Sequence, residues 1–140
     1  MINDLRVDGL GFFLYRSTAR PDLTSDDMKD ILQVARRRNQ ALGLTGCLHH
    51  EEGLFFQWLE GPQAALMHVR DLILQDSRHR DVVMLDQGGL DHRRFQDWQM
   101  RFSDRDRASL MDWFARSTSP TVHRGEYAGG VVAFMMSMNV

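Results

Sequence analysis

The sequence predicts one α+β domain in which two helices pack on the same face of a mixed sheet. Short runs of alternating apolar residues, typical of strands, are interspersed with longer runs that repeat apolar residues at helical spacing. Their order is strand, helix, strand, strand, helix, strand, strand. At 140 residues, of which 43% are hydrophobic, the chain is long enough for one compact core.

The first strand and the first helix are predicted from alternation and from a capping signal. Residues 9–16 alternate apolar side chains between two faces, as in a buried strand. Thr24, three residues before Asp27, is an N-cap signature, and a helix is expected over 25–38. Three arginines then fall in its last turn, where they complement the helix dipole, and Gly43 follows as a stop signal.

The middle of the chain predicts a hairpin followed by a second helix. Residues 44–50 and 54–60 are strand-like, and the short loop 51–53 contains a glycine suited to a hairpin turn. Pro62 lies where the start of a helix tolerates proline, and an apolar stripe continues to Ile73.

The remaining elements complete a ferredoxin-like βαββαββ sheet with two C-terminal helices added. Residues 82–85 are interpreted as a buried strand, and 95–102 as a last strand with one inward face. Helices are expected over 109–116 and 126–138. These two helices have two possible roles: they cover the other face of the sheet, or they meet a partner.

Composition and charge disfavour several classes of function. Seventeen basic residues against nineteen acidic ones give a net charge of −2, which supplies no basic field for nucleic acid. No apolar run approaches the length that spans a membrane, and no signal peptide is recognisable. Cys47 is the only cysteine, which favours a reducing, cytoplasmic location. His49 and His50 face opposite ways on a strand and disfavour a shared metal.

Two polar side chains fall where a core is expected. Gln57 shares a strand face with Phe55 and Leu59, and Tyr15 brings a phenol to the same sheet. Burying such groups without partners costs about 1–3 kcal/mol each, so the two are expected to bond each other or a ligand. A simple polar pair within the core and a binding site both remain open.

Polar residues also gather at the expected ends of both helices. Arg38 and Asn39 end the first helix, and Asp76, Arg78 and His79 follow the second. In one interpretation Asn39 is a C-cap and the arginines are a solvated surface. In the other, the two helix ends form a polar rim around a flat ligand slotted between them.

Several motifs in combination resemble one family. They are Tyr15-Arg16-Ser17, Arg38-Asn39, Leu44-Thr45-Gly46, Phe55-Phe56-Gln57-Trp58-Leu59-Glu60-Gly61, Asp76-Ser77-Arg78-His79 and Phe95-Gln96-Asp97-Trp98-Gln99-Met100. Together they resemble the BLUF family, sensors of blue light using FAD, over roughly residues 9–102. The chain looks like the short stand-alone members of that family.

The resemblance implies FAD as the cofactor and assigns roles to particular residues. The isoalloxazine ring is expected between the two helices, and the implied cofactor-binding residues are Ile31, Arg38, Asn39, Gln57, Ile73, Asp76, Arg78 and His79. The implied photoactive residues are Tyr15, Gln57, Trp98 and Met100. Tyr15 would give up an electron and a proton, and the Gln57 amide would reverse its hydrogen bonds.

The resemblance also implies how the signal leaves. Trp98 and Met100, on the inward face of the last strand, would relay it to the terminal helices, although ordinary core packing remains an alternative role for both. We therefore expect a photosensory domain over 1–103 and a helical extension over 104–140. The predicted function is a photoreceptor that signals to a separate downstream protein, with a homodimer possible. A flavin-dependent oxidoreductase and a cofactor-free interaction module are the alternatives.

Overall fold

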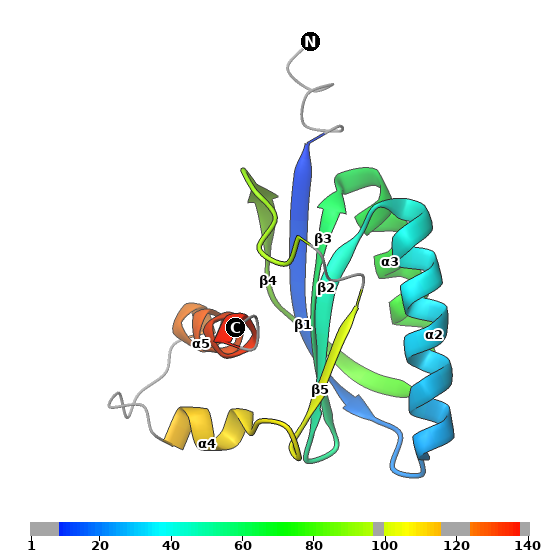
Figure 1. Ribbon diagram of the computed structural model, residues 1–140, viewed down its shortest axis with the longest axis vertical. Helices are drawn as coiled ribbons and strands as arrows, with labels where there is room; N and C mark the ends of the chain where they lie inside the picture. Colours follow the sequence, from blue (N-terminus) through cyan, green and yellow to red (C-terminus); the bar gives the residue numbers. More distant parts are fainter. Residues whose placement is uncertain (1–8, 97–99, 116–123, 138–140) are drawn as a thin grey trace.

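The computed structural model describes residues 9–96, 100–115 and 124–137, and Figure 1 shows their arrangement. The elements in chain order are β1 (Leu10–Ala19), α2 (Ser25–Leu42), β2 (Thr45–Glu51), β3 (Leu54–Pro62), α3 (Gln63–Gln75), β4 (His79–Leu90), β5 (Arg101–Asp104), α4 (Leu110–Ala115) and α5 (Arg124–Ser137). The predicted order of strands and helices is confirmed.

The strands form one mixed sheet in the order β4-β1-β3-β2-β5. All neighbouring pairs are antiparallel except β2 and β5, which are parallel. Helices α2 and α3 lie on one face, and α4 and α5 lie on the opposite side (Figure 1). The predicted α+β, ferredoxin-like architecture with two added C-terminal helices is therefore confirmed.

Alternation along the strands divides the apolar residues into two cores. Between the sheet and α2 and α3 lies a core that we call the cleft-side core; its buried members include Phe13, Tyr15, Leu32, Ala35, Leu48, Phe55, Leu59, Leu66, Val69, Ile73 and Met100. On the other face lies the terminal-helix core, which includes Leu14, Cys47, Phe56, Trp58, Leu85, Phe95, Leu110, Val131, Val132, Phe134 and Met135. Strands β1 and β3 contribute to both cores, since successive side chains point to opposite faces.

Helix α2 begins as predicted and ends later than predicted. Thr24 and Asp27 form a reciprocal capping box. The helix continues to Leu42 and stops at Gly43, which adopts a left-handed φ of 69°. The predicted end at residue 38 is wrong because the next residues are compatible with helix until a left-handed conformation is required. Asn39 is therefore a buried residue inside the helix and not a C-cap.

The strands β2 and β3 form the predicted hairpin. Glu52 and Gly53 both have positive φ, 52° and 75°, as in the two-residue turns whose twist matches that of the flanking strands. Pro62 is the N-cap of α3, and Asp76 is its C-cap. The hairpin places β3 at the centre of the sheet, with β1 and β2 as neighbours.

The two edge strands differ from the predictions. The residues 82–85 were expected to be a buried strand; they are the middle of the longer β4, which lies at an edge and buries only Leu85. Four apolar residues in a row favour a buried strand, but β4 has a neighbour only on its β1 side. Of the predicted last strand over 95–102, residues 97–99 lie outside the described residues and 95, 96 and 100 are not strand; the described strand is Arg101–Asp104.

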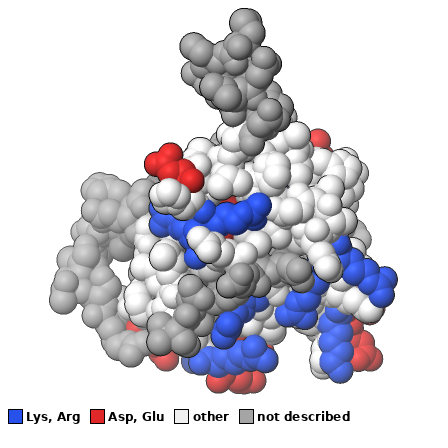
Figure 2. All heavy atoms as spheres, turned by 45° about the horizontal axis from the view of Figure 1, so that its top comes forward, with Lys and Arg blue, Asp and Glu red and all other residues white. Residues whose placement is uncertain are grey.

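The C-terminal helices lie close to their predicted positions. Of the two roles left open for them, coverage of the outer sheet face is what the structure shows, because Val131 and Phe134 join the terminal-helix core. No described helix is both long and apolar enough to cross a membrane. On the face shown in Figure 2, basic side chains lie in separate groups, some of them beside acidic side chains.

Candidate functional site

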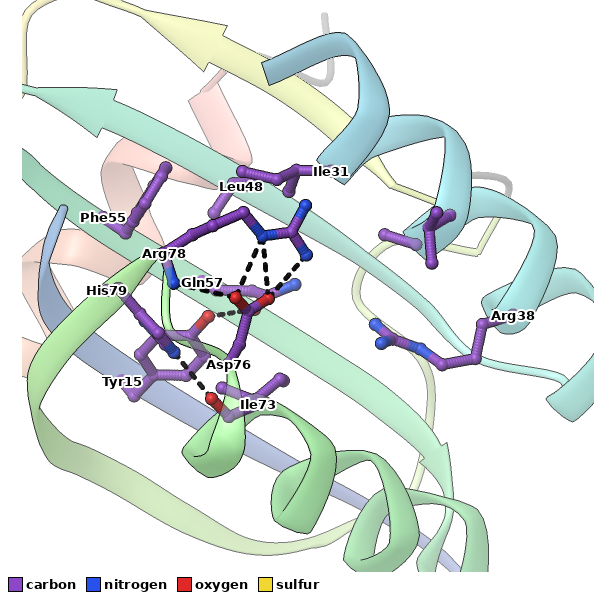
Figure 3. Close-up of a pocket in the computed structure, with 12 residues that line it drawn as sticks. Tyr15, Ile31, Arg38, Leu48, Phe55, Gln57, Ile73, Asp76, Arg78 and His79 are labelled. Carbon is purple, nitrogen blue, oxygen red and sulfur yellow. Dashed lines mark hydrogen bonds and ion pairs between the residues drawn. The ribbon is translucent and has the colours of Figure 1, made fainter. Parts of the chain in front are cut away.

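A cleft opens between α2 and α3 above the cleft-side face of the sheet. Its empty space is about 530 Å³, a figure that includes space open to solvent. The lining residues are Tyr15, Ile31, Val34, Ala35, Arg38, Leu48, Phe55, Gln57, Ile73, Asp76, Arg78 and His79 (Figure 3). The walls are mainly apolar, and the polar groups come from the strands and from the helix ends.

The floor of the cleft carries a buried hydrogen-bond chain. Tyr15 on β1 is the direct cross-strand partner of Gln57 on β3, and the Tyr15 hydroxyl donates to Gln57 Oε1. The other end of the amide, Nε2, lies 3.6 Å from Met100 Sδ. Gln57 is only 4% exposed, so its amide has few alternatives to these partners. Tyr15 and Gln57 therefore bond each other, one of the arrangements left open by the sequence.

The electrostatics of the floor keep the phenol protonated. Burial raises the pKa of Tyr15 well above its usual value; the positive charge of Arg38 opposes this shift, and the negative charge of Asp76 adds to it. The Tyr15 hydroxyl is therefore a neutral donor at physiological pH. Its proton leaves only if the phenol is oxidised or if a strong acceptor is brought close.

The rim at the end of α3 is built around one ion pair. Arg78 Nε donates to Asp76 Oδ1 at 2.9 Å, and the Nη2 group donates to Oδ2 at 2.6 Å. The backbone N–H of Arg78 also donates to Asp76. Hydrogen bonds from Arg78 lower the pKa of Asp76 against the opposing effect of burial, and the same contact raises the pKa of Arg78. This fork fixes a charged pair at the mouth of the cleft (Figure 3).

His79 connects the end of α3 to the sheet. Its Nδ1 lies 2.7 Å from Ser17 Oγ, and its Nε2 lies 2.6 Å from the carbonyl oxygen of Ile73. Both ring nitrogens therefore have partners within the protein. The ring also contacts the edge of Tyr15. His79 thus joins the rim of the cleft to its floor, and its ring lines the cleft.

The rim at α2 has an unused donor. The Nε of Arg38 is buried and has no hydrogen-bond partner among the described residues. Burial lowers the pKa of Arg38, while the nearby Tyr15 and Asp76 raise it. Figure 3 shows the Arg38 side chain extending from α2 into the cleft, with its guanidinium on the side of the Asp76–Arg78 pair. A buried guanidinium donor of this kind is suited to an oxygen of a bound ligand.

The structure brings together seven of the eight sequence-predicted binding residues. Asn39 is the exception: it is fully buried one position beyond Arg38 and does not line the cleft. Of the predicted photoactive set, Tyr15, Gln57 and Met100 meet in the buried chain, and Trp98 falls outside the described residues.

Four apolar residues that line the cleft were not predicted as site residues: Val34, Ala35, Leu48 and Phe55. Spacing alone could have identified some of them, because Val34 and Ala35 follow Ile31 by three and four residues on one helix face.

Glu60 and Arg36, which were not predicted as site residues, hold Arg94–Phe95 and Met100 respectively. The Glu60 carboxylate is fully buried and accepts hydrogen bonds from four donors: Thr45 Oγ1, Trp58 Nε1, Arg94 N and Phe95 N. Arg36 Nε donates to the Met100 carbonyl at 3.0 Å. Apart from the Trp58–Glu60 contact within one strand, these contacts join residues far apart in the chain, and no sequence motif predicts them.

Comparison with known proteins assigns the family. The family model described as sensors of blue-light using FAD, BLUF, matches residues 10–101. The chain belongs to the BLUF family. Its fold matches the dark-state structure of BlrB, a BLUF protein, with a TM-score of 0.80 and 30% identity, over 94% of this chain and 98% of BlrB. It is therefore a flavin-binding blue-light receptor that uses FAD.

Curated relatives place this domain in longer proteins. An alpha-like subunit of photoactivated adenylate cyclase from Euglena gracilis is 44% identical over 69 residues, which are 49% of this chain and 7% of the relative. The blue light- and temperature-regulated antirepressor BluF of Escherichia coli is 36% identical over 72 residues, 51% of this chain and 18% of the relative. The chain thus spans less than a fifth of the length of these relatives.

The cleft fits the cofactor that the family uses. A flavin ring is flat and apolar on its faces, with carbonyl and imide groups along one edge. Ile31 on α2 and Ile73 on α3 offer apolar contacts from the two sides, and Arg38 Nε and the Gln57 amide offer hydrogen bonds. Bound FAD absorbs blue light and, once excited, is a strong oxidant.

Proposed function

We propose that the isoalloxazine ring of FAD lies in the cleft between α2 and α3, and that the Tyr15–Gln57 contact is the light switch. The observation that carries this proposal is the buried hydrogen bond from the Tyr15 hydroxyl to the Gln57 amide on the cleft floor. A donor–acceptor pair at that place can respond to a change in the ligand above it.

We assign the ring contacts to the residues that line the cleft. Arg38 Nε donates to a ring oxygen, and Ile31 and Ile73 pack on the ring faces. The Asp76–Arg78 pair borders the ring or the phosphates, and His79 supports it. The proposed role of Asn39 at the carbonyl and imide edge rests on the family motif alone, because Asn39 does not line the cleft.

The switch follows from the chemistry of the amide. Tyr15 can give an electron and then a proton to its surroundings and recover both afterwards. Gln57 has an acceptor end and a donor end, which in this structure face Tyr15 and Met100 respectively. Rotation or tautomerisation of the amide exchanges these partners without a lasting covalent change. The hydrogen bonds around the ring then differ between dark and light.

The signal is proposed to leave through β5. Met100 contacts Gln57 and directly precedes β5, and Trp98 is assigned to the same relay. Residues 1–103 would form the photosensory domain and 104–140 its helical extension, with Leu110 and Phe134 packed on the sheet. We propose that the chain is not itself an enzyme and signals to a separate protein in the cytoplasm. A homodimer through the outer sheet face or the tail is also proposed; because α4 and α5 cover the outer face, use of that face would require them to move.

The test is the absorption spectrum of the full chain loaded with FAD, before and after blue light. The wild-type protein is expected to show a reversible red shift. Tyr15→Phe and Gln57→Leu should still bind flavin and lose this photocycle. The matched control is Tyr127→Phe, which changes the only other tyrosine, a residue of the terminal-helix side. A normal photocycle in either site variant would contradict the mechanism, and steady light-independent oxidation of NADH would favour an oxidoreductase.

A further inference from the structure

Two buried polar atoms without partners lie side by side on the terminal-helix face of the sheet. His49 on β2 is fully buried, and its Nδ1 has no hydrogen-bond partner among the described residues. Ser103 on β5 is 1% exposed, and its Oγ is likewise unpartnered. His49 and Ser103 are direct cross-strand partners in the parallel β2–β5 ladder. Such unsatisfied buried groups are rare in native proteins and call for an explanation.

Both side chains point away from the flavin cleft. Met100 and Phe102 belong to the cleft-side core, so that Ser103, the next residue, faces the other side of the sheet. The His49 ring contacts Phe134 of α5 edge-on, with ring centroids 4.8 Å apart. The pair therefore lies at the junction of β5 with the terminal helices.

The hydrogen bonds of His49 determine what its free nitrogen can do. The Nε2 atom lies 2.9 Å from Glu51 Oε1. Burial raises the pKa of Glu51, but hydrogen bonds from His49, Ser109 and the α4 backbone outweigh this effect and lower it, so the group is a carboxylate that only accepts. His49 Nε2 is then the donor. In the neutral ring Nδ1 is a bare acceptor, and the Ser103 hydroxyl is a donor without an acceptor.

Glu51 continues the contact into α4. Its carboxylate accepts from Ser109 Oγ at 2.8 Å, from Leu110 N at 2.6 Å and from Met111 N at 3.2 Å. These are the first groups of α4, whose N–H groups have no partner inside the helix. His49 is thus two hydrogen bonds away from the start of α4, through Glu51, and one ring contact away from α5.

Strand β5 has few backbone pairings. It is four residues long, lies at the sheet edge and pairs only with β2. The residue before it, Met100, contacts the Gln57 amide across a long N–S distance. A small displacement of β5 would therefore alter the Gln57 contact on one face and the His49–Ser103 spacing on the other.

We propose that His49 and Ser103 are positioning residues of a second hydrogen-bond switch, in which the Ser103 hydroxyl donates to His49 Nδ1 in only one position of β5. Light changes the Gln57–Met100 contact, β5 shifts, and the His49–Glu51 pair transmits the shift to α4 and α5. This inference rests on the proposed function of the cleft. It adds a defined contact that carries the signal from one face of the sheet to the other.

The direct test is nitrogen NMR of the full chain, loaded with FAD and labelled in its histidines, in the dark and under blue light. The His49 Nδ1 resonance is expected to change between the two states, from a bare to a hydrogen-bonded acceptor. Ser103→Ala should keep the flavin red shift and abolish this change. If Ser103 had only a structural role, Ser103→Ala would not remove the light-dependent change of the His49 resonance.

A matched pair of variants tests the outward step. His49→Gln should keep the red shift and lose the light-dependent change in hydrogen exchange at the Leu110 and Met111 amides. His50→Gln is the control, since His50 is the next residue on β2, contacts Phe55 on the opposite face and should behave as wild type. Equal His49 resonances in dark and light, or a wild-type response in both Ser103→Ala and His49→Gln, would overturn the inference. Absence of the red shift in the wild-type protein would overturn the proposed function and the coupling with it.

Discussion

The two faces of the sheet each carry an apolar core, but their buried polar groups differ. On the terminal-helix face, the carboxylates of Glu51 and Glu60 are enclosed by donors from the protein itself. On the cleft side, Arg38 keeps a buried donor without a partner in the described chain, and Gln57 reaches Met100 only across 3.6 Å. This difference separates polar groups that support the fold from polar groups that serve a function. Fully satisfied carboxylates such as Glu51 and Glu60 hold the fold, whereas the unpartnered Arg38 Nε beside the cleft is suited to a ligand. Among the described residues of the terminal-helix face, the unpartnered atoms of His49 and Ser103 are the exception, and they are the ones assigned to the second switch.

The largest effect is expected from emptying the terminal-helix core. Met135→Ala removes a fully buried side chain and should lower the free energy of unfolding by about 3 kcal/mol, as buried Met→Ala changes do. The neighbouring Met136 is 40% exposed, and Met136→Ala should change the free energy of unfolding by less than about 0.5 kcal/mol. Urea unfolding monitored by circular dichroism measures both. Equal losses would show that α5 does not dock as described.

A smaller effect, on FAD binding and not on the free energy of unfolding, is expected at the cleft. Arg38→Met should weaken FAD binding about tenfold or more, because a charge-assisted hydrogen bond contributes about 1.5–3 kcal/mol. The free energy of unfolding of the flavin-free protein should not fall, since Arg38 Nε has no partner to lose. Arg37→Met, in the adjacent exposed position, is the control. Titration of apoprotein with FAD measures the affinities, and unchanged binding in Arg38→Met would remove this residue from the site.

The terminal-helix face should also respond to acid. The pKa of Glu51 is lowered below its ordinary value of 4.5 in the folded protein. Its contribution to stability is therefore complete above about pH 4.5 and is lost as the pH falls through the lowered value. Protection of the Leu110 amide against hydrogen exchange should decrease in that window. Glu51→Gln should remove this pH dependence, whereas Glu52→Gln, at the exposed turn, should preserve it.

The smallest effects separate two adjacent glycines of α5. Nothing lies within 4 Å of a Cβ added at Gly129, so Gly129→Ala should stabilise the protein by about 0.5–1 kcal/mol through helix propensity. At Gly130 an added Cβ would meet the Phe114 ring at 2.7 Å, and Gly130→Ala should destabilise it. Thermal unfolding compares the two. Stabilisation by both would mean that α4 and α5 are not packed at Gly130.

The sequence predicted the faces of the central strands well because burial alternates with a period of two. Tyr15 and Gln57 were placed on one face and expected to bond, and the register pairs them directly. Element ends were predicted less well. Consecutive arginines before Asn39 resemble the end of a helix, but the helix ends where Gly43 supplies a left-handed residue.

Contacts between distant segments were beyond the sequence. His49 and His50 were correctly placed on opposite faces, and alternation puts Glu51 on the His49 face; yet no local pattern indicates that His49 meets Phe134 and the unpartnered Ser103. Such clusters depend on which strands are neighbours in the sheet, and β5 pairs with β2 although the two strands are far apart in the sequence. The cleft was predictable because family motifs mark it, and the support on the other face was not.

The shape of strand β4 also bears on how the receptor behaves at high concentration. An exposed sheet edge is a template on which other chains can add strands and aggregate. β4 counters this with register shifts in its pairing to β1, a left-handed Asp81 and the exposed charges of Arg80 and Asp86. These features discourage an intruding strand from pairing along its length. The photoreceptor should therefore stay dispersed when it is overproduced.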